Sequence, residues 1–277
     1  MRLLQFLREK CPEASSVKSL KRAIDGKLCT VNNRVETFSS YALEEGDSVI
    51  LLEAVKDAVK NVKVTVLFED KDLVIINKPA GLVSDIRSIR PCLTITGPLE
   101  LVHRLDKETT GVLILAKTKE AKEAMIALFK ERTIRKVYLA IVDGVVAKDE
   151  GLIDKHLGKK HAYQGQTVYG VVDEKKGLRA ITYWKCLKRA KVASVVCCEP
   201  YTGRTHQLRV HLSAMGHPIL GDSQYGKKFL CGLKPRRNLL HAYSVTFKHP
   251  MTGKEIKVKA PIPADFKLAL EELKLSL

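Results

Sequence analysis

The chain has 277 residues, of which 45% are hydrophobic, and a formal net charge of +17 at pH 7. This length suffices for one large domain and one small domain, and the excess of basic residues points to a polyanionic partner. The sequence has no run of about 18 apolar residues, and residues 1–10 lack an apolar signal core, so we expect no membrane span, no secretory signal and no membrane partner.

Cysteine usage favours a reducing compartment. The seven cysteines are odd in number, and no two of them are spaced as C-x-x-C. This pattern disfavours both a structural zinc site and a disulfide framework. We therefore expect reduced thiols and a cytoplasmic protein.

Residues 1–55 have the pattern of a small separate module. Leucines near the N-terminus predict a short helix, and a second helix is predicted at 17–24. Strand-and-turn patterns follow at 29–33 and 46–50. Residues 1–60 hold ten Lys/Arg and nine Asp/Glu, so almost all of the net positive charge belongs to the remainder of the chain.

Three basic residues of the second predicted helix share one face. Lys18, Lys21 and Arg22 are spaced i, i+3 and i+4, which places them side by side on a helix. Such a face is either a solvated basic surface or a surface that contacts phosphates. We take these three residues as candidate RNA-binding residues.

The remainder of the chain predicts an α+β domain, joined to the module by residues 54–61. Strands are predicted at 62–68, 72–76, 112–116, 136–142, 180–186, 192–198, 240–247 and 255–259, and helices at 118–131 and 204–215. Because strands outnumber helices and do not alternate with them, we expect a mixed, mainly antiparallel sheet.

The stretch LVHRLDKETTGVLILAKT, residues 101–118, places charged residues directly before an apolar strand. Arg104 and Asp106 are two residues apart, so in an extended segment their side chains point the same way. The pair is either a surface ion pair, which contributes little to stability, or part of a site. Two further stretches favour a site.

The stretch 199–226 concentrates cationic and hydrogen-bonding groups. These groups are Arg204, His206, Arg209, His211 and His217. A metal site of His206, His211 and Asp222 is one alternative, but the two histidines are five residues apart and no H-E-x-x-H motif occurs. A phosphate site with an arginine that pairs with a carboxylate is better supported.

The stretch RKVYLAIVDG, residues 135–144, carries Tyr138 on a predicted strand. Tyr138 is either a core or rim aromatic residue or a platform on which a base stacks.

Together these stretches resemble the RluA-type RNA pseudouridine synthases over nearly the whole chain. The matching strings begin at Asn77 (NKPAGLV), His103 (HRLDKETTGVLILAKT), Lys136 (KVYLAIVDG), Thr202 (TGRTHQLRVHL) and Leu240 (LHAY). Five strings in the same order are a specific signal. The first module resembles the alpha-L RNA-binding fold through its VNN and GDSV turns.

The resemblance implies a role for each candidate residue. Asp106 is the expected catalytic carboxylate, Arg209 its ion-pair partner, and Tyr138 the aromatic residue that stacks on the flipped uracil. Leu208 is expected to pack against the base and Arg104 to fill the vacated stack. The residues expected to form walls or contact phosphate are His103, Arg204 and Lys136.

The same resemblance implies the partners and the domain organisation. An alpha-L RNA-binding domain is expected at 1–55 and a pseudouridine synthase domain at 62–277. The implied activity is isomerisation of specific uridines in RNA, foremost in large-subunit ribosomal RNA. We expect a monomer that needs no cofactor and no metal.

One departure from the family pattern leaves alternatives open. Only about twenty residues separate Gly81 from His103, and Ser84-Asp85 stands where the family usually has a His-Pro pair. A short segment near the catalytic motif is also compatible with a catalytically inactive RNA-binding ribosome assembly factor. A metal-dependent RNA hydrolase is the third hypothesis.

Overall fold

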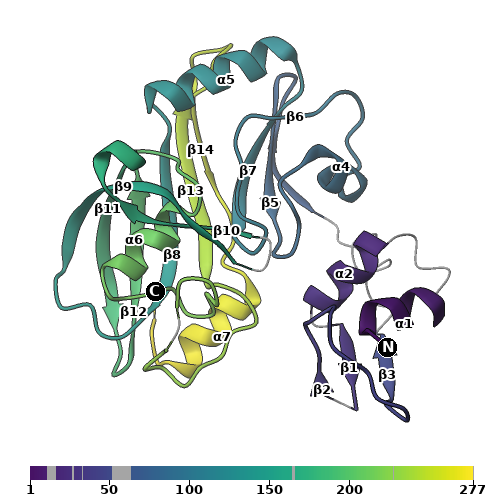
Figure 1. Ribbon diagram of the computed structural model, residues 1–277. Coiled ribbons are helices and arrows are strands. Elements are labelled where there is room, and N and C mark those ends of the chain that lie inside the picture. Colours follow the sequence, from purple (N-terminus) through teal and green to yellow (C-terminus); the bar gives the residue numbers. More distant parts are fainter. Residues whose placement is uncertain are drawn as a thin grey trace. The chain divides into compact units, whose positions relative to one another are not determined.

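The computed structural model describes residues 1–10, 17–26, 28–32, 34–51, 64–163, 166–226 and 228–276. The chain forms two compact units, Met1–Val62 and Lys63–Leu277 (Figure 1). The predicted joint at 54–61 lies outside the described residues.

The smaller unit packs two helices on a three-stranded antiparallel sheet. Its elements are α1 (Leu3–Lys10), α2 (Val17–Asp25), β1 (Cys29–Val31), β2 (Arg34–Val35) and β3 (Val49–Leu51), with the strand order β2-β1-β3. These elements confirm the two predicted helices and the two predicted strands. The residues of the core are Leu3, Leu7, Leu20, Ile24, Cys29 and Val31.

An asparagine joins the two turns of the smaller unit. Asn32 has a φ of 50°, its Nδ2 donates to Asp47 Oδ1 at 2.7 Å, and its Oδ1 accepts from the Ser48 N–H at 2.9 Å. Asn33 lies outside the described residues. Lys21 is exposed on α2, whereas the side chains of Lys18 and Arg22 lie outside the described part of the structure.

The larger unit is built on an eleven-stranded sheet with the main order β10-β9-β11-β12-β8-β13-β7-β5-β4. Its strands are β4 (Thr65–Glu69), β5 (Leu73–Lys78), β6 (Glu100–Leu101), β7 (Thr110–Ala116), β8 (Arg135–Asp143), β9 (Glu150–Tyr163), β10 (Gln166–Val172), β11 (Leu178–Arg189), β12 (Ala193–Pro200), β13 (Leu240–Lys248) and β14 (Glu255–Lys259). The pairing of β13 with β7 is parallel and the other pairings are antiparallel. The predicted mixed, mainly antiparallel α+β fold is confirmed.

Helices cover the sheet at several places. They are α4 (Ile86–Ile89), α5 (Lys119–Glu131), α6 (Gln207–Ala214) and α7 (Ala264–Glu272), together with the 3₁₀ turns η1 (Arg90–Cys92) and η2 (Glu174–Lys176). In β5, Leu73 and Ile75 face the core that α5 covers, while Val74 and Ile76 face the core beneath α4 and η1. This alternation fixes β5 and β7 between two buried layers.

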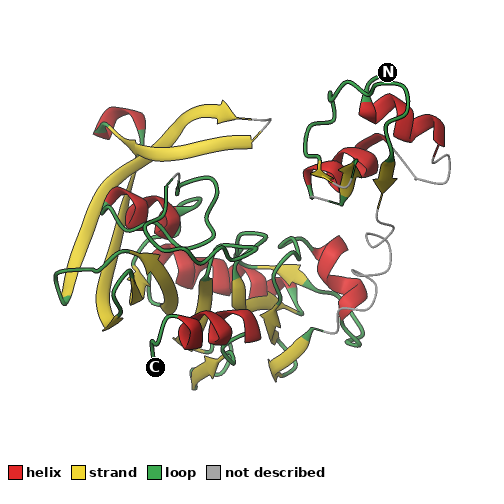
Figure 2. Cartoon of the chain, turned by 90° about the horizontal axis from the view of Figure 1, so that it is seen from below, coloured by secondary structure: helices red, strands yellow, loops and turns green. Residues whose placement is uncertain are grey.

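The predicted strands and the helix at 118–131 are confirmed, but the sequence analysis missed the ribbon of β9 and β10. Figure 2 shows this ribbon extending away from the body of the larger unit. In β9 the apolar residues are scattered among lysines and histidines, and Leu152 is 60% exposed. The period-two alternation that marks a half-buried strand is therefore absent from β9.

The C-terminal helix α7 was also missed. Phe266, Ala269 and Leu270 bury its inner face against a core that includes Leu208 and Leu212 of α6. The short helix follows Pro263, and only nine residues carry its pattern. Among the described residues, no helix is both long enough and apolar enough to cross a membrane.

Candidate active site

A cavity of about 770 Å³ in the larger unit brings the predicted site residues together. Its lining comes from the segment before β7, from α5 and β8, from Tyr169 of β10, and from the segment that leads into α6. The predicted residues that line it are His103, Arg104, Asp106, Lys136, Tyr138, Arg204, Leu208 and Arg209. The basic residues of α2 belong to the other unit.

A tight turn fixes the backbone of Asp106. The Thr109 N–H donates to Asp106 O at 3.1 Å and so closes the turn. Inside the turn, Lys107 O accepts from the Gly81 N–H and from Lys78 Nζ, each at 3.0 Å. The loop with the NKPAG string thus supports the turn through two hydrogen bonds to Lys107 O.

Lys78 is the anchor of this arrangement. Its side chain is fully buried, and its Nζ also donates to Pro79 O at 2.9 Å and to Leu82 O at 2.8 Å. Burial lowers the pKa of Lys78 to about 7, while the charges of Glu108 and Asp106 oppose this shift. The amine therefore crosslinks three backbone carbonyls of two loops.

The glycine after the turn is required by close packing. Gly111 has a φ of 109°, and a Cβ there would lie 2.2 Å from Ala242 O. Thr110 and Gly111 pair in parallel with His241 and Ala242 of β13. Only glycine allows this approach, which brings β13 against the turn that carries Asp106.

The short segment that departs from the family pattern braces the same turn. Ser84 Oγ donates to Leu105 O at 2.7 Å and accepts from the Leu105 N–H at 3.1 Å. Asp85 caps α4 by accepting from the Ser88 N–H at 2.8 Å. The substituted pair Ser84-Asp85 therefore supports the backbone beside Asp106.

Arg209 connects Asp106 to a second carboxylate that the sequence analysis did not assign to the site. Arg209 Nη1 donates to Asp106 Oδ2 at 3.3 Å, and its Nε and Nη2 donate to Asp222 at 2.7 and 2.9 Å. Nη2 also donates to Gln224 Oε1 at 3.0 Å, and the guanidinium lies 4.8 Å from the centre of the Tyr225 ring. Arg209 is thus held on several sides and presents one nitrogen to Asp106.

His206 lies just before the helix that the structure forms in this segment, although the sequence predicted a helix over 204–215. The helix begins at Gln207, and His206 has a left-handed backbone with a φ of 55° and a ψ of 20°. The prediction that this helix begins at residue 204 is therefore wrong. Its side chain nevertheless reaches the site, with Nε2 at 3.8 Å from Asp106 Oδ1.

The metal site considered for His206, His211 and Asp222 does not form. His211 is buried, and its Nδ1 lies 2.9 Å from the hydroxyl of Thr182. Asp222 has both carboxylate oxygens on Arg209. The three groups point to different partners.

Burial sets the charge of the other polar residues in the cavity. Burial raises the pKa of Tyr138, and the charge of Asp106 raises it further, so the phenol stays protonated. Burial, with a smaller effect of Arg132, lowers the pKa of Lys136 to about 8. The cavity therefore offers a phenol donor and an ammonium that still carries charge at pH 7.

His103 is a neutral wall residue. Its Nε2 accepts from the Ile114 N–H at 2.9 Å, and its ring lies 4.8 Å from that of Phe129. Burial lowers its pKa to about 3, with Lys136 adding to the effect. Of the two roles expected for His103, the arrangement favours a wall over a cationic phosphate contact.

Around the pair, sequence reasoning considered Asp222 only as a metal ligand and gave Tyr225 and Tyr169 no role. The string GDSQYG carries the first two, and it follows the arginine-rich stretch directly. An Asp and a Tyr in the same polar stretch as Arg209 were the available signal. Tyr169 could not be found because its strand was not predicted.

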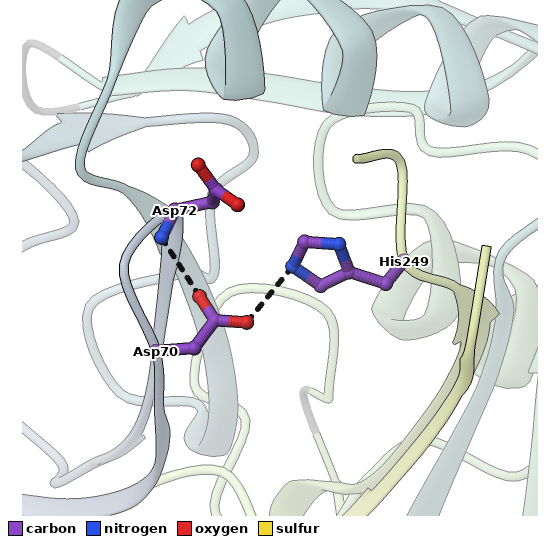
Figure 3. Close-up of side chains that lie close together, drawn as sticks. All are labelled: Asp70, Asp72 and His249. Carbon is purple, nitrogen blue, oxygen red and sulfur yellow. Dashed lines mark hydrogen bonds and ion pairs between the residues drawn. The ribbon is translucent and has the colours of Figure 1, made fainter. Parts of the chain in front are cut away.

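A second polar cluster lies outside the cavity, where Asp70, Asp72 and His249 bring ligand-type atoms within 4.8 Å of one another (Figure 3). His249 Nδ1 accepts from the N–H groups of Met251 and Thr252, each at 3.2 Å. This leaves the imidazole hydrogen on Nε2, which faces Asp70 Oδ2 at 3.0 Å. One oxygen of Asp72 has no hydrogen-bond partner among the described residues. The contact between His249 and Asp70 nevertheless explains the cluster better as a polar link between two turns than as a cation site.

Comparison with known proteins gives consistent matches. A sequence model of the family described as RNA pseudouridylate synthase matches residues 72–214. Ribosomal large subunit pseudouridine synthase C of Buchnera aphidicola is 37% identical, over 83% of this chain and 76% of that protein. Ribosomal large subunit pseudouridine synthase D of Haemophilus influenzae is 31% identical, over 99% of this chain and 91% of that protein. The solved structure of human RNA pseudouridylate synthase domain containing 4 has a TM-score of 0.66 and 30% identity, over 80% of this chain and 97% of that one.

Proposed function

The chain belongs to the RNA pseudouridylate synthase family and is an RNA-modifying isomerase, and from this premise we propose that it acts on large-subunit ribosomal RNA with Asp106 as the catalytic carboxylate. The observation that carries the assignment is the pairing of Asp106 with Arg209 at the cavity wall, at 3.3 Å. The Asp106 side chain is 28% exposed, so a nucleoside in the cavity can reach it. The names of the relatives and the net charge of +17 support ribosomal RNA.

The reaction replaces the N1–C1′ glycosidic bond by a C5–C1′ bond and moves one hydrogen from C5 to N1 in balance. The N1–C1′ bond of uridine is cleaved, the uracil turns, C5 bonds to C1′, the C5 proton leaves, and N1 gains a proton. A carboxylate can attack C1′ or can assist removal of a ribose proton. Both routes use the carboxylate form of Asp106, and Arg209 Nη1 lies opposite its Oδ2 as the counter-charge.

The remaining cavity residues suit a base that has left its stack. Tyr138 and Leu208 form apolar walls on which the uracil packs, and Arg104 is exposed at the rim, where it can fill the vacated stack. Extruding the base costs a few kcal/mol, least in loops. Lys136 and Arg204 also line the cavity, and in this proposal they contact the flanking phosphates.

Tyr138 acts in this proposal as a hydrogen-bond donor. Its raised pKa keeps the phenol protonated near neutral pH, which favours a donor over a phenolate base. It can instead donate to a uracil carbonyl while its ring stacks on the base.

For the smaller unit we propose RNA binding through the α2 face of Lys18, Lys21 and Arg22. Replacing all three by Gln should weaken binding to ribosomal RNA and leave the rate at saturating RNA unchanged. Replacing Arg2, Arg8 and Lys10 of the same unit by Gln is the matched control for charge. If both triple variants weakened RNA binding equally, the α2 face would contribute only through its charge and would not be a specific RNA-binding surface.

The central experiment is release of tritium from C5-tritiated uridine in ribosomal RNA. The wild type should release tritium, and Asp106→Asn should release none while it still binds RNA. Asp149→Asn, at a carboxylate that is 83% exposed, is the matched control and should keep the wild-type rate. Release by Asp106→Asn at the wild-type rate would overturn the assignment.

The same assay separates the alternative functions. A catalytically inactive assembly factor would bind RNA without release of tritium from any variant. A metal-dependent hydrolase would cleave the RNA and would stop after addition of a chelator. Mapping pseudouridines in cells that lack this protein tests the substrate, since loss from transfer RNA alone would contradict ribosomal RNA.

A further inference from the structure

His206 adopts a backbone conformation that is uncommon for residues other than glycine. Its φ of 55° and ψ of 20° lie in the left-handed region, where glycine and asparagine are favoured. Such conformations cost roughly 1–3 kcal/mol and persist where the surrounding structure holds them, often at functional sites. The conformation directs the imidazole into the cavity, where its side chain is 20% exposed.

We assign the imidazole hydrogen of His206 from its contact with Tyr225. The Tyr225 hydroxyl oxygen accepts from the Tyr169 N–H at 3.2 Å and lies 2.8 Å from His206 Nδ1. The phenol hydrogen can then be donated to Nδ1, and on this arrangement we assign Nδ1 as the acceptor. In the neutral ring the remaining hydrogen sits on Nε2, the nitrogen that faces Asp106.

The two oxygens of Asp106 thus face two different donors. Oδ1 lies 3.8 Å from His206 Nε2, and Oδ2 lies 3.3 Å from Arg209 Nη1. Both distances are longer than an ideal hydrogen bond, as is common in active sites without substrate. Burial lowers the pKa of His206, the charge of Asp106 opposes this, and Arg209 adds to the lowering, which supports a neutral ring.

We propose that His206 is a positioning residue for Asp106: its Nε2–H holds Oδ1, so that the carboxylate is oriented by His206 on one oxygen and by Arg209 on the other. The role rests on the proposed catalytic function of Asp106. No proton passes from His206 in this role. Its task is to restrict rotation of the carboxylate when the nucleoside enters.

Two substitutions separate the side chain's function from the backbone strain. In His206→Gln the amide nitrogen can occupy the place of imidazole Nε2, but glutamine fits the left-handed backbone poorly. In His206→Asn the amide occupies the place of Nδ1 next to Tyr225 and cannot reach Asp106, whereas asparagine tolerates the backbone well. Stability and activity are therefore expected to rank the two variants in opposite order.

The measurement is single-turnover release of tritium from C5-tritiated large-subunit ribosomal RNA by the full chain, with urea denaturation for stability. His206→Asn should be at least as stable as His206→Gln, yet about 10²-fold slower than wild type at saturating RNA. His206→Gln should stay within about tenfold of wild type. Activity of His206→Asn equal to or above that of His206→Gln would overturn the proposal, because only the backbone would then matter.

Tyr225→Phe provides a second, independent readout. Removing the hydroxyl frees the imidazole to exchange its hydrogen between the two nitrogens, so the single-turnover rate should fall while RNA affinity is kept. An unchanged rate would count against the proposal. Asp106→Asn distinguishes failure of the proposed catalytic function from failure of the positioning role. If Asp106→Asn stays active, the proposed function of Asp106 is wrong. If Asp106→Asn is inactive while His206→Asn is fully active, only the role of His206 is wrong.

Discussion

Arg209 and Asp222 form a buried two-pronged ion pair, with Nε and Nη2 of the guanidinium at 2.7 and 2.9 Å from the two carboxylate oxygens. Asp222 Oδ1 also accepts from the N–H groups of Gln224 and Tyr225. This pair leaves Nη1 as the nitrogen directed to Asp106. Asp222 therefore orients the arginine that, in our proposal, pairs with the catalytic carboxylate.

Asp222→Asn should destabilise the protein strongly. The change leaves a buried guanidinium with weaker compensation, and losing one partner of a buried pair costs about 3–5 kcal/mol. Urea denaturation measures the loss, and tritium release should fall with it. Asp265→Asn is the matched control, because Asp265 binds Arg237 with the same two nitrogens but is 51% exposed. Equal losses for both variants would contradict the special role of the buried pair.

Much of the fold could be predicted because its central strands carry a local signal. In β5 and β7 nearly every residue is buried, which gives apolar runs that stand out from their surroundings. The ribbon of β9 and β10 gave no such signal, since its pairing with β11 and not its own apolar pattern defines it. Tertiary pairing of this kind is not visible in a single sequence.

The site was predictable as a set of residues but not as a geometry. Asp106 and Arg209 are 103 positions apart, and no spacing rule indicates that they meet. The family resemblance supplied that pair, while Asp222 was considered only as a metal ligand. The left-handed backbone of His206 is likewise invisible in the sequence, where the residue reads as the start of a helix.

The acid sensitivity of the fold should depend on His103. Its pKa falls from 6.5 to about 3 on burial, so between these values the unfolded chain binds more protons than the folded chain. The free energy of unfolding therefore decreases as pH falls through this window. His103→Gln removes the effect, and its stability relative to wild type should improve by about 2 kcal/mol between pH 7 and pH 5.

Urea denaturation at pH 7, 6 and 5 tests this expectation. His161→Gln, at an exposed histidine, is the control and should show the same pH dependence as wild type. Parallel curves for His103→Gln and wild type would show that His103 is not kept neutral by the fold.

The salt dependence of RNA binding should report the charge of Lys136. Burial lowers its pKa to about 8, so the side chain is mostly charged at pH 7 and mostly neutral at pH 9. At pH 7, Lys136→Gln should reduce the slope of log K against log salt by about 1. At pH 9 the difference from wild type should shrink. Lys267→Gln, on the exposed face of α7, is the control and should leave the slope unchanged. If Lys267→Gln reduced the slope as much as Lys136→Gln, the assignment of Lys136 as a phosphate contact would be wrong.

Tyr138 should act as a phenol at every pH at which the protein is stable. Burial and Asp106 both raise its pKa, so its ionisation should not contribute to the rate between pH 7 and 9.5. The wild-type rate of tritium release should therefore lack the tenfold rise per pH unit that a phenolate base would give.

Tyr138→Phe should lower the rate by about 10²-fold at each pH, since a positioned donor is lost. Tyr243→Phe, outside the cavity lining, is the matched control. A rate that climbs with pH in wild type and becomes flat in Tyr138→Phe would instead identify Tyr138 as the base.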